Sequence, residues 1–396
     1  MPDIPSIKKR LEQEVKQLRA PGGYLYAGLP RFKGLFGRDS CISSLQFLEH
    51  DPSIARATLS LLARWQGKKI NYRSEEQPGK ILHEYYEQIT LDILRYRWRL
   101  FFIWKFPYYG ALDSTSLFLV LLGEYIRKTN DLDFARKLWP AVAEAYRWMI
   151  KFGDRDGDSF LEYQRLNPRG ILHQVWKDSE LYPGITLPVA PIEVQGYTFA
   201  AFLSAAHLGE LIGGNKDLPD EARQNARLLQ EKLAKFFWMP EAQYFAWGLD
   251  GDKRQLTDIT SNPGHLLFCG ILDKTYEEKI IERLFAEDMW TPFGIRTYST
   301  KSPHFDPRNY HLGSVWPHDN WIIWLGLKRR GYHREARRIF EALLAADQAL
   351  GGRLPELYGV DAQGKIIETA QRPSYPQAWA TGALLSMIGY YEKGDV

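Results

Sequence analysis

The chain has 396 residues, enough for one large domain or two ordinary ones. It carries 51 Lys and Arg residues against 48 Asp and Glu residues, and a net charge of only +3 argues against nucleic acid as the main partner. The longest purely apolar run, residues 117–122, is far too short to span a bilayer, so no membrane partner is expected.

Aromatic residues and cysteines narrow the class of protein further. Aromatic side chains make up 14% of the chain and include 13 Trp residues. Most of them belong to a large core, and the surplus in polar loops predicts the walls of a sugar pocket, because a flat amphipathic ring covers the apolar face of a pyranose. The two cysteines, Cys41 and Cys269, lie in apolar helical stretches and are expected to be buried free thiols. The N-terminal sequence is not that of a signal peptide, which favours a soluble cytoplasmic protein.

Helical periodicity dominates the chain, and two kinds of helix alternate along it. One kind is strongly amphipathic with a charged face, and the other is apolar or small almost all round. Beginning with the amphipathic kind, the predicted helices alternate in the order 4–18, 37–50, 51–67, 113–128, 132–152, 194–213, 220–238, 261–272, 273–290, 316–331, 333–350 and 375–392. A helix that is apolar all round is buried, and a helix with a charged face lies outside. The pattern predicts an all-α fold, a single (α/α)6 toroid over residues 1–396 with six inner and six outer helices.

The connections between these helices predict where a functional site lies. Each connection from an inner to an outer helix is short, whereas the connections from outer to inner helices are long and comprise residues 68–112, 153–193, 239–260, 291–315 and 351–374. In a ring of antiparallel helix pairs, all the long connections fall on one rim, above the N-termini of the inner helices. Long loops on a rigid scaffold commonly carry function. Residues 68–112 also contain a further short helix near 87–99.

Two carboxylates in these long connections are the strongest candidates for chemistry. Asp178 lies in Val-Trp-Lys-Asp-Ser, and Glu356 lies in Arg-Leu-Pro-Glu-Leu-Tyr-Gly. Two carboxyl groups facing each other across one pocket are the minimal equipment for glycoside hydrolysis. Partial desolvation of Asp178 beside Trp176 and Ser179 would raise its pKa, as a general acid requires. The structural alternatives are a turn or N-cap role for Asp178 and an ion pair between Glu356 and Arg353.

Further polar segments open the predicted inner helices. Arg38 and Asp39 stand at the first turn of one of them, where they could grip sugar hydroxyls or form a structural ion pair. The segment 310–320 allows a cap, or a metal site built from His311, His318 and Asp319, but its spacing matches no recognised metal motif and no metal is predicted.

Other motifs give little support to other chemistries. The stretch Asp-Arg-Asp-Gly-Asp-Ser at 154–159 resembles the first half of a calcium loop but lacks the Gly and Glu that an EF-hand requires, so an acidic turn is preferred. The chain contains no HExxH, GxSxG, P-loop or GxGxxG motif.

Taken together, these segments resemble the glucosidase domain of glycogen debranching enzymes, the amylo-α-1,6-glucosidase type. That domain belongs with the glucoamylase-like and trehalase-like (α/α)6 glycoside hydrolases. The matching segments follow one another over most of the chain, at residues 37–40, 109–115, 174–179, 293–297, 311–320 and 354–357. The most specific are Trp-Lys-Asp-Ser and Gly-Ser-Val-Trp-Pro-His-Asp-Asn.

The resemblance implies a role for individual residues and no cofactor. Asp178 would be the general acid, and Glu356 the general base that activates water in an inverting hydrolysis of a terminal α-linked glucose. The residues implied in binding the carbohydrate are Arg38, Asp39, Trp176, Trp316, His318 and Asp319, with Tyr109, Asp113 and Glu84 as candidates at the rim.

The resemblance leaves the substrate open. The predicted toroid begins close to residue 1, without the accessory region that debranching enzymes use for a long polymer, so a small glucoside is an alternative to glycogen. Hydrolases of trehalose, kojibiose or a glucosylated compatible solute such as glucosylglycerate share the fold. A toroid epimerase or isomerase with His residues as acid and base is another alternative, as is a catalytically silent carbohydrate-binding toroid.

Overall fold

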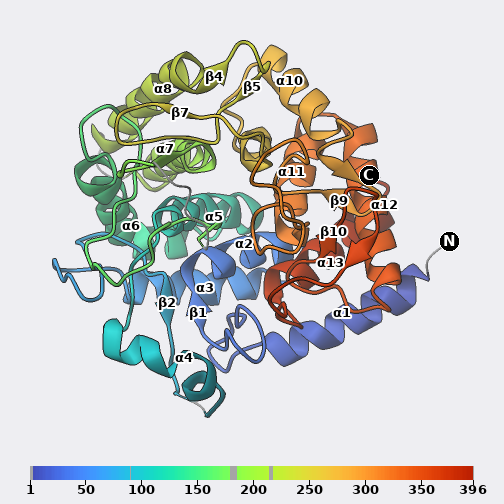
Figure 1. The fold of residues 1–396 in the computed structure, drawn as a ribbon. Helices are drawn as coiled ribbons and strands as arrows, with labels where there is room; N and C mark the ends of the chain where they lie inside the picture. Colours follow the sequence, from blue (N-terminus) through green and yellow to red (C-terminus); the bar gives the residue numbers. More distant parts are fainter. Residues whose placement is uncertain (1–2, 90, 179–184, 214–216, 396) are drawn as a thin grey trace.

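The computed structural model describes residues 3–89, 91–178, 185–213 and 217–395, and these residues are mostly helical (Figure 1). Six helices contact one another in turn, and the last of them contacts the first, so that they close a ring. In chain order they are α2 (Gly37–Phe47), α5 (Asp113–Thr129), α7 (Ile192–Ile212), α9 (His265–Cys269), α11 (Pro317–Arg329) and α13 (Ala378–Glu392). Every residue of α2 is buried, as its apolar and small sequence predicts.

A second set of helices alternates with these in sequence and packs against them from outside. The set comprises α1 (Ile4–Leu18), α3 (Pro52–Arg64), α6 (Leu132–Trp148), α8 (Asp217–Phe237), α10 (Lys274–Leu284) and α12 (His333–Ala349). Figure 1 shows α1, α6, α8, α10 and α12 around the periphery of the molecule. Each outer helix buries one face only; α1, for example, buries Leu11, Glu14 and Leu18. The predicted alternation of apolar and amphipathic helices is therefore present along the whole chain.

Three predicted helices differ clearly from the observed ones. The segment 261–272 forms only a 3-10 turn, η2 (Asn262–Gly264), followed by the short helix α9. Gly270 ends α9 with a left-handed φ of 75°, and its N–H donates to the carbonyl oxygen of Leu266. The outer helix predicted over 132–152 continues past α6 as a π-helical turn, η1 (Met149–Gly153). The additional helix in the 68–112 connection is α4 (Leu91–Ile103), later in the chain than predicted.

The all-α prediction is wrong in one respect, because the long connections contain two-residue strands. These are β1 (Leu35–Phe36), β2 (Glu84–Tyr85), β3 (Ala190–Pro191), β4 (Trp238–Met239), β5 (Tyr244–Phe245), β6 (Gly248–Leu249), β7 (Gln255–Leu256), β8 (Trp290–Thr291), β9 (Gly294–Ile295), β10 (Gly359–Val360) and β11 (Ile366–Ile367). They pair antiparallel as β1–β2, β3–β6–β7, β4–β5, β8–β9 and β10–β11. Buried connections need partners for their backbone groups, and the short ladders supply them.

The core extends through the ring and into the outer layer. Its largest fully buried side chains include Trp148, Trp316, Trp321 and Trp324. Cys41 and Cys269 are buried free thiols, as predicted. Among the described residues, no helix is long and apolar enough to cross a membrane.

Candidate active site

A cavity of about 360 Å³ opens where several inner helices begin. Four of its walls come from stretches that are far apart in sequence: the segment before α2, the 68–112 connection, the 153–193 connection and the segments around the starts of α11 and α13. We call it the central cavity. Six predicted site residues line it, namely Arg38, Asp39, Trp176, Asp178, Trp316 and Glu356.

Asp178 and Glu356 both line the central cavity, although they lie in different long connections. The side chain of Asp178 is 30% exposed, and its Oδ2 lies 3.5 Å from Nη2 of Arg38. Ser179, which the sequence suggested as a neighbour of this carboxyl group, lies outside the described residues. The structure thus brings the two candidate carboxylates to one cavity, as the sequence predicted.

Glu356 is held by three hydrogen-bond donors. The hydroxyl of Tyr310 donates to Oε1 at 2.5 Å, Nε2 of Gln377 donates to Oε1 at 3.2 Å, and the backbone N–H of Ser374 donates to Oε2 at 3.1 Å. The alternative of an ion pair with Arg353 is not observed among the described residues; the Arg353 guanidinium lies 4.6 Å from the ring centroid of Tyr375. Donors of this kind favour the ionised form of a carboxyl group.

Three carboxyl groups at the central cavity have raised pKa values, and burial is the main cause for each. Burial raises the pKa of Asp178 to about 6, with Arg38 opposing the rise. It raises the pKa of Glu356 to about 7, with the Tyr310 hydroxyl opposing it. Burial also raises the pKa of Asp39 to about 7; Arg38 opposes this rise, and the charges of Glu356 and Asp178 add to it. A negative charge on one of these carboxyl groups raises the pKa of the others, so their titrations are linked.

Arg38 organises the acidic groups at the start of α2. Its Nη1 donates to Oδ2 of Asp113 at 2.9 Å, and its Nε lies 3.9 Å from Oδ1 of Asp39. Asp113 is buried beneath Arg38, where burial raises its pKa and the guanidinium opposes the rise. Asp113 therefore holds Arg38 in place, and Arg38 and Asp39 form the surface that a ligand can touch.

Trp rings form an aromatic wall of the central cavity. Trp176, Trp316 and Trp379 line it, with 5.8 Å between the ring centroids of Trp176 and Trp316. His318 is fully buried and stacks on Trp379 at 3.8 Å, and neither of its ring nitrogens has a hydrogen-bond partner among the described residues. Burial lowers the pKa of His318 well below its ordinary range, so the imidazole is neutral. His318 packs behind the wall and does not line the central cavity, and its contact with a ligand stays a prediction.

Asp319 also lies below the wall rather than in it. Its Oδ1 is hydrogen-bonded to Nε2 of His265 at 2.6 Å, and Nδ1 of His265 is hydrogen-bonded to the hydroxyl of Tyr197 at 2.6 Å. All three side chains are buried. This chain of hydrogen bonds joins α7, α9 and α11 under the cavity, which is a supporting position.

Lys177 anchors the segment that carries Asp178. Its Nζ donates to Oδ1 of Asn262 at 2.6 Å and to the carbonyl oxygen of Thr297 at 3.0 Å. The ammonium also lies 4.7 Å from the ring centroid of Trp176. Lys177 therefore points away from the central cavity, whereas its neighbours Trp176 and Asp178 line it.

Two rim candidates hold other groups in place. Glu84 is fully buried; it accepts from the Tyr86 hydroxyl at 2.5 Å and from Nη2 of Arg97 at 2.5 Å. Arg97 itself lines the central cavity. The hydroxyl of Tyr109 donates to the carbonyl oxygen of Trp65 at 2.6 Å, and its ring belongs to the core.

Sequence reasoning did not single out Tyr310, Trp379, Arg31 or Arg97 as cavity residues. A signal for Trp379 exists in retrospect. It stands in the first turn of α13, and Arg38 and His318 hold the equivalent place in α2 and α11. Arg97 gave no such signal, because it belongs to the additional helix α4 and not to the ring.

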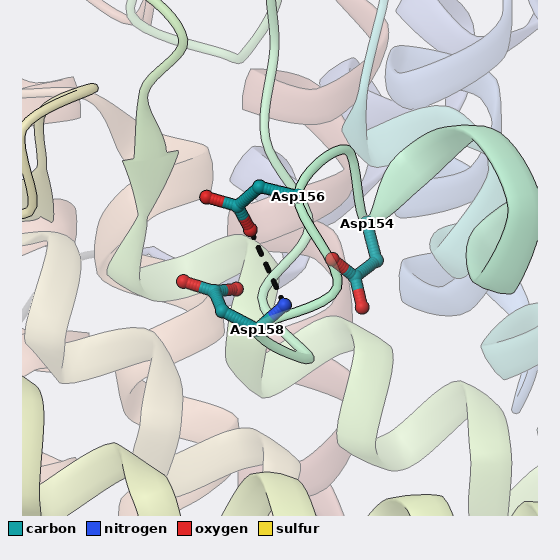
Figure 2. Close-up of side chains that lie close together, drawn as sticks. All are labelled: Asp154, Asp156 and Asp158. Atoms are coloured by element: carbon teal, nitrogen blue, oxygen red, sulfur yellow. Dashed lines mark hydrogen bonds between the residues drawn. The ribbon is translucent and has the colours of Figure 1, made fainter.

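The acidic turn at 154–158 does not line the central cavity. Figure 2 shows the side chains of Asp154, Asp156 and Asp158 close together. Ligand atoms of Asp154, Asp156 and Asp158 lie within 4.8 Å of one another, the only group of three such residues among those described. Lys253 lies between them, with its Nζ 2.7 Å from Asp156 Oδ2 and 2.6 Å from Asp158 Oδ2, and it also pairs with Glu162. The Lys253 ammonium pairs with two of the three aspartates and offsets part of their negative charge, which favours a structural acidic turn.

A cavity with two carboxylates and an aromatic wall fits the class of glycoside hydrolases. The family model described as the mannosylglycerate hydrolase MGH1-like glycoside hydrolase domain matches residues 151–358, a little over half of the chain, and this range includes both Asp178 and Glu356. The chain therefore belongs to this family and is a glycoside hydrolase. A comparison with curated proteins found no match.

Solved structures share the fold at low sequence identity. A GH63 mannosylglycerate hydrolase from Thermus thermophilus, in complex with Tris, has 14% identity and a TM-score of 0.71 over 97% of this chain and 99% of that one. A glycosidase variant in complex with glucose has 13% identity and a TM-score of 0.68 over 99% of this chain and 97% of its own. A rhamnosidase from Klebsiella oxytoca has 15% identity and a TM-score of 0.67 over 99% of this chain and 64% of that one.

These comparisons correct the resemblance drawn from the sequence. The broader expectation of a glycoside hydrolase of (α/α)6 type is supported. The family that matches is that of mannosylglycerate hydrolase-like enzymes and not specifically that of the glycogen debranching enzymes.

Proposed function

We propose that this chain is an inverting glycosidase that removes a hexose from a small α-glycoside, and that its ring forms a single (α/α)6 catalytic domain. The observation that carries the proposal is that Asp178 and Glu356 line one cavity together with an aromatic wall. Closed contacts among the six inner helices support the toroid. Both carboxylates also fall within the range that matches the family model.

In this mechanism Asp178 protonates the glycosidic oxygen and Glu356 deprotonates the attacking water. The hydrogen bonds from Tyr310, Gln377 and Ser374 favour a charged Glu356, as a base requires. Asp178 has no comparable set of donors among the described residues, and burial raises its pKa to about 6, just below that of Glu356. The assigned roles require the protonation state in which Glu356 is ionised and Asp178 holds the proton, and the three donors to Glu356 favour that state. An inverting site needs room for the water between the two carboxyl groups, a separation of roughly 6.5–9.5 Å.

Arg38, Asp39 and the Trp wall would hold the sugar. Arg38 donates hydrogen bonds, and Asp39, with its pKa raised to about 7, can either donate or accept near neutral pH. Trp176, Trp316 and Trp379 offer apolar surface to the ring of the sugar. These contacts lie around the two reacting carboxyl groups, so they orient the bond to be cleaved.

We propose a substrate with a small, acidic aglycone, such as glucosylglycerate or mannosylglycerate, in place of the branched polymer. The volume of about 360 Å³ is at the low end of the range for ligand pockets, about 300–1,000 Å³. Arg31 lines the cavity and supplies positive charge for a carboxylate, and Arg97, although paired with Glu84, lines it as well. The matching family is named after mannosylglycerate hydrolase, and a structure of the Thermus enzyme holds D-glycerate.

A substrate panel tests this proposal. Purified enzyme would be incubated with glucosylglycerate, mannosylglycerate, trehalose, kojibiose, isomaltose and a branched limit dextrin, and free hexose would be measured. We expect the highest kcat/KM with one of the two glycerates and no hydrolysis by Asp178→Asn. Preferential hydrolysis of the limit dextrin would contradict the proposed substrate, and an undiminished Asp178→Asn rate would contradict the assigned acid.

A further inference from the structure

The exposed apolar side chains of this protein are concentrated in one segment. Eight of the fourteen large apolar side chains that are exposed among the described residues lie between Ile70 and Phe102, within the 68–112 connection. On α4, Leu91 is 85% exposed, Trp98 50% and Phe102 75%. Contiguous apolar surface of this kind marks an interaction site.

These side chains form a stripe along α4. Leu91, Leu94, Trp98 and Phe102 are spaced three, four and four residues apart, which places them on one face of the helix. The rings of Trp98 and Phe102 contact each other edge to face at 5.9 Å. Figure 1 shows α4 at the edge of the molecule, outside the ring. The opposite face of α4 contributes Arg97 and Leu100 to the central cavity, so the stripe is not needed to fix the helix to the body.

A second apolar segment adjoins the C-terminal end of the stripe. Nη2 of Arg73 donates to the carbonyl oxygen of Phe102 at 3.4 Å, and the N–H of Lys105 donates to the carbonyl oxygen of Arg73 at 3.3 Å. The preceding side chains Ile70 and Tyr72 are 56% and 67% exposed. We call the surface formed by Ile70, Tyr72, Leu91, Leu94, Trp98 and Phe102 the α4 surface.

The α4 surface is bordered by positive charge. Arg95 and Arg99 are exposed and flank the stripe, and Lys105 is exposed beyond its end. No carboxylate whose side chain the structure describes forms an ion pair with any of these three side chains. Arg95, Arg99 and Lys105 thus place exposed positive charge beside exposed apolar surface.

We infer that the α4 surface binds an anionic lipid surface, with the apolar stripe in the interface and the arginines at the headgroups. A helix with an apolar face flanked by Arg, and with Trp and Phe in that face, has the character of a helix that lies in a membrane interface. Anionic lipids attract basic residues by about 1 kcal/mol each. This inference differs from the expectation of no membrane partner, which rested on the lack of an apolar run long enough to span a bilayer; a helix that lies in the interface needs no such run.

Two other binding partners fit the α4 surface less well. In a twofold dimer the same patch meets itself, so Arg95 and Arg99 would approach like charges from the second copy. A nucleic acid would satisfy the arginines but leave the aliphatic side chains Leu91 and Leu94 without an apolar partner. A lipid interface accepts both kinds of side chain.

The test is co-sedimentation of the full chain with vesicles of phosphatidylcholine, with and without phosphatidylglycerol. We expect binding only to the vesicles that contain phosphatidylglycerol, weakening as salt is raised. Trp98→Ser with Phe102→Ser should abolish binding, and Arg95→Gln with Arg99→Gln should weaken it about thirtyfold. The matched controls are Leu203→Ser with Leu211→Ser on α7, and Arg136→Gln with Arg147→Gln on α6, all exposed positions away from α4. These should bind as the unchanged chain does, and thermal unfolding would confirm that every variant is folded.

Several results would overturn the inference. These are equal loss of binding in the control variants, no binding to phosphatidylglycerol vesicles, or binding to a DNA duplex but not to vesicles. A dimer by light scattering that dissociates in Trp98→Ser with Phe102→Ser would show that the α4 surface joins two copies instead. The measurement does not use hydrolysis, so its outcome is independent of the proposed substrate.

Discussion

Replacing Tyr310 by Phe should shift the pH dependence of the enzyme in a defined direction. The hydroxyl of Tyr310 donates to Oε1 of Glu356 at 2.5 Å and thereby favours the ionised carboxylate. A hydrogen bond to a charged group contributes about 1.5–3 kcal/mol. One pKa unit corresponds to about 1.36 kcal/mol, so Tyr310→Phe should raise the pKa of Glu356 by about one to two units. The starting value is about 7.

The sign of the effect follows from the role of Glu356 as a base. A base acts only when ionised, so a higher pKa moves the acidic limb of kcat/KM to higher pH. At pH 6 we expect Tyr310→Phe to lose about 10- to 100-fold in kcat/KM, with the loss becoming smaller as pH rises above the new pKa. The assay is kcat/KM on the best substrate of the panel between pH 5 and pH 10.

A matched control is available in the same chain. The hydroxyl of Tyr109 also donates one short hydrogen bond, but to the carbonyl oxygen of Trp65 away from the central cavity. Tyr109→Phe should therefore leave the acidic limb where it is. An acidic limb that does not move in Tyr310→Phe, or a loss of equal size at every pH, would refute the reasoning that Tyr310 tunes Glu356.

Other substitutions test the remaining parts of the site. Asp178→Asn should lower kcat by about 10²- to 10⁴-fold. The midpoint of thermal unfolding should stay nearly constant, because the side chain is 30% exposed, and a large fall in that midpoint would contradict this. Lys177→Met should lower kcat more than it changes KM, by up to about 10²-fold, because it releases the anchor of the Asp178 segment, and a change in KM alone would speak against an anchor. Arg38→Met should reduce the free energy of unfolding by about 3–5 kcal/mol, since it leaves Asp113 buried and unpaired. Urea denaturation measures this free energy. The double variant Arg38→Met with Asp113→Asn should recover part of the lost stability.

The ring of helices could be predicted because each inner helix is apolar almost all round, a pattern that no surface helix shares. The helix over 261–272 was predicted too long, because its apolar residues suggest a full helix. The observed helix is shorter because Pro263 lies in the 3-10 turn before it and Gly270 ends it. Both effects depend on backbone conformation, which apolar periodicity does not reveal. The short strands could not be predicted, because two residues carry no periodicity.

The two carboxylates could be found because short polar segments with Trp and Pro stand out in the long connections. Arg38 and Asp39 were found in the same way. Asp319 and Glu84 were assigned to ligand binding, but each pairs with a side chain that is far away in the sequence, His265 and Arg97. Such pairings depend on which elements the fold brings together, and one sequence alone gives no measure of that.

Trp379 is the opposite case, a residue that lines the cavity but was not predicted to. In an apolar inner helix it has the sequence context of a core residue, and its side chain is in fact only 3% exposed. Its contribution to the cavity wall depends on the first turn of α13 lying beside Trp316, with 6.0 Å between the ring centroids. That contact is a property of the closed ring.

The most direct test of the central claim is the configuration of the sugar at the moment of its release. Proton NMR would follow the anomeric signals during hydrolysis of the best α-linked substrate, before mutarotation mixes the anomers. If Asp178 and Glu356 act as acid and base across one water, the β-anomer of the free hexose appears first. Initial release of the α-anomer would mean a retaining mechanism, in which one carboxylate attacks the sugar directly at a separation of about 5–5.5 Å, and would contradict the roles assigned to these two residues.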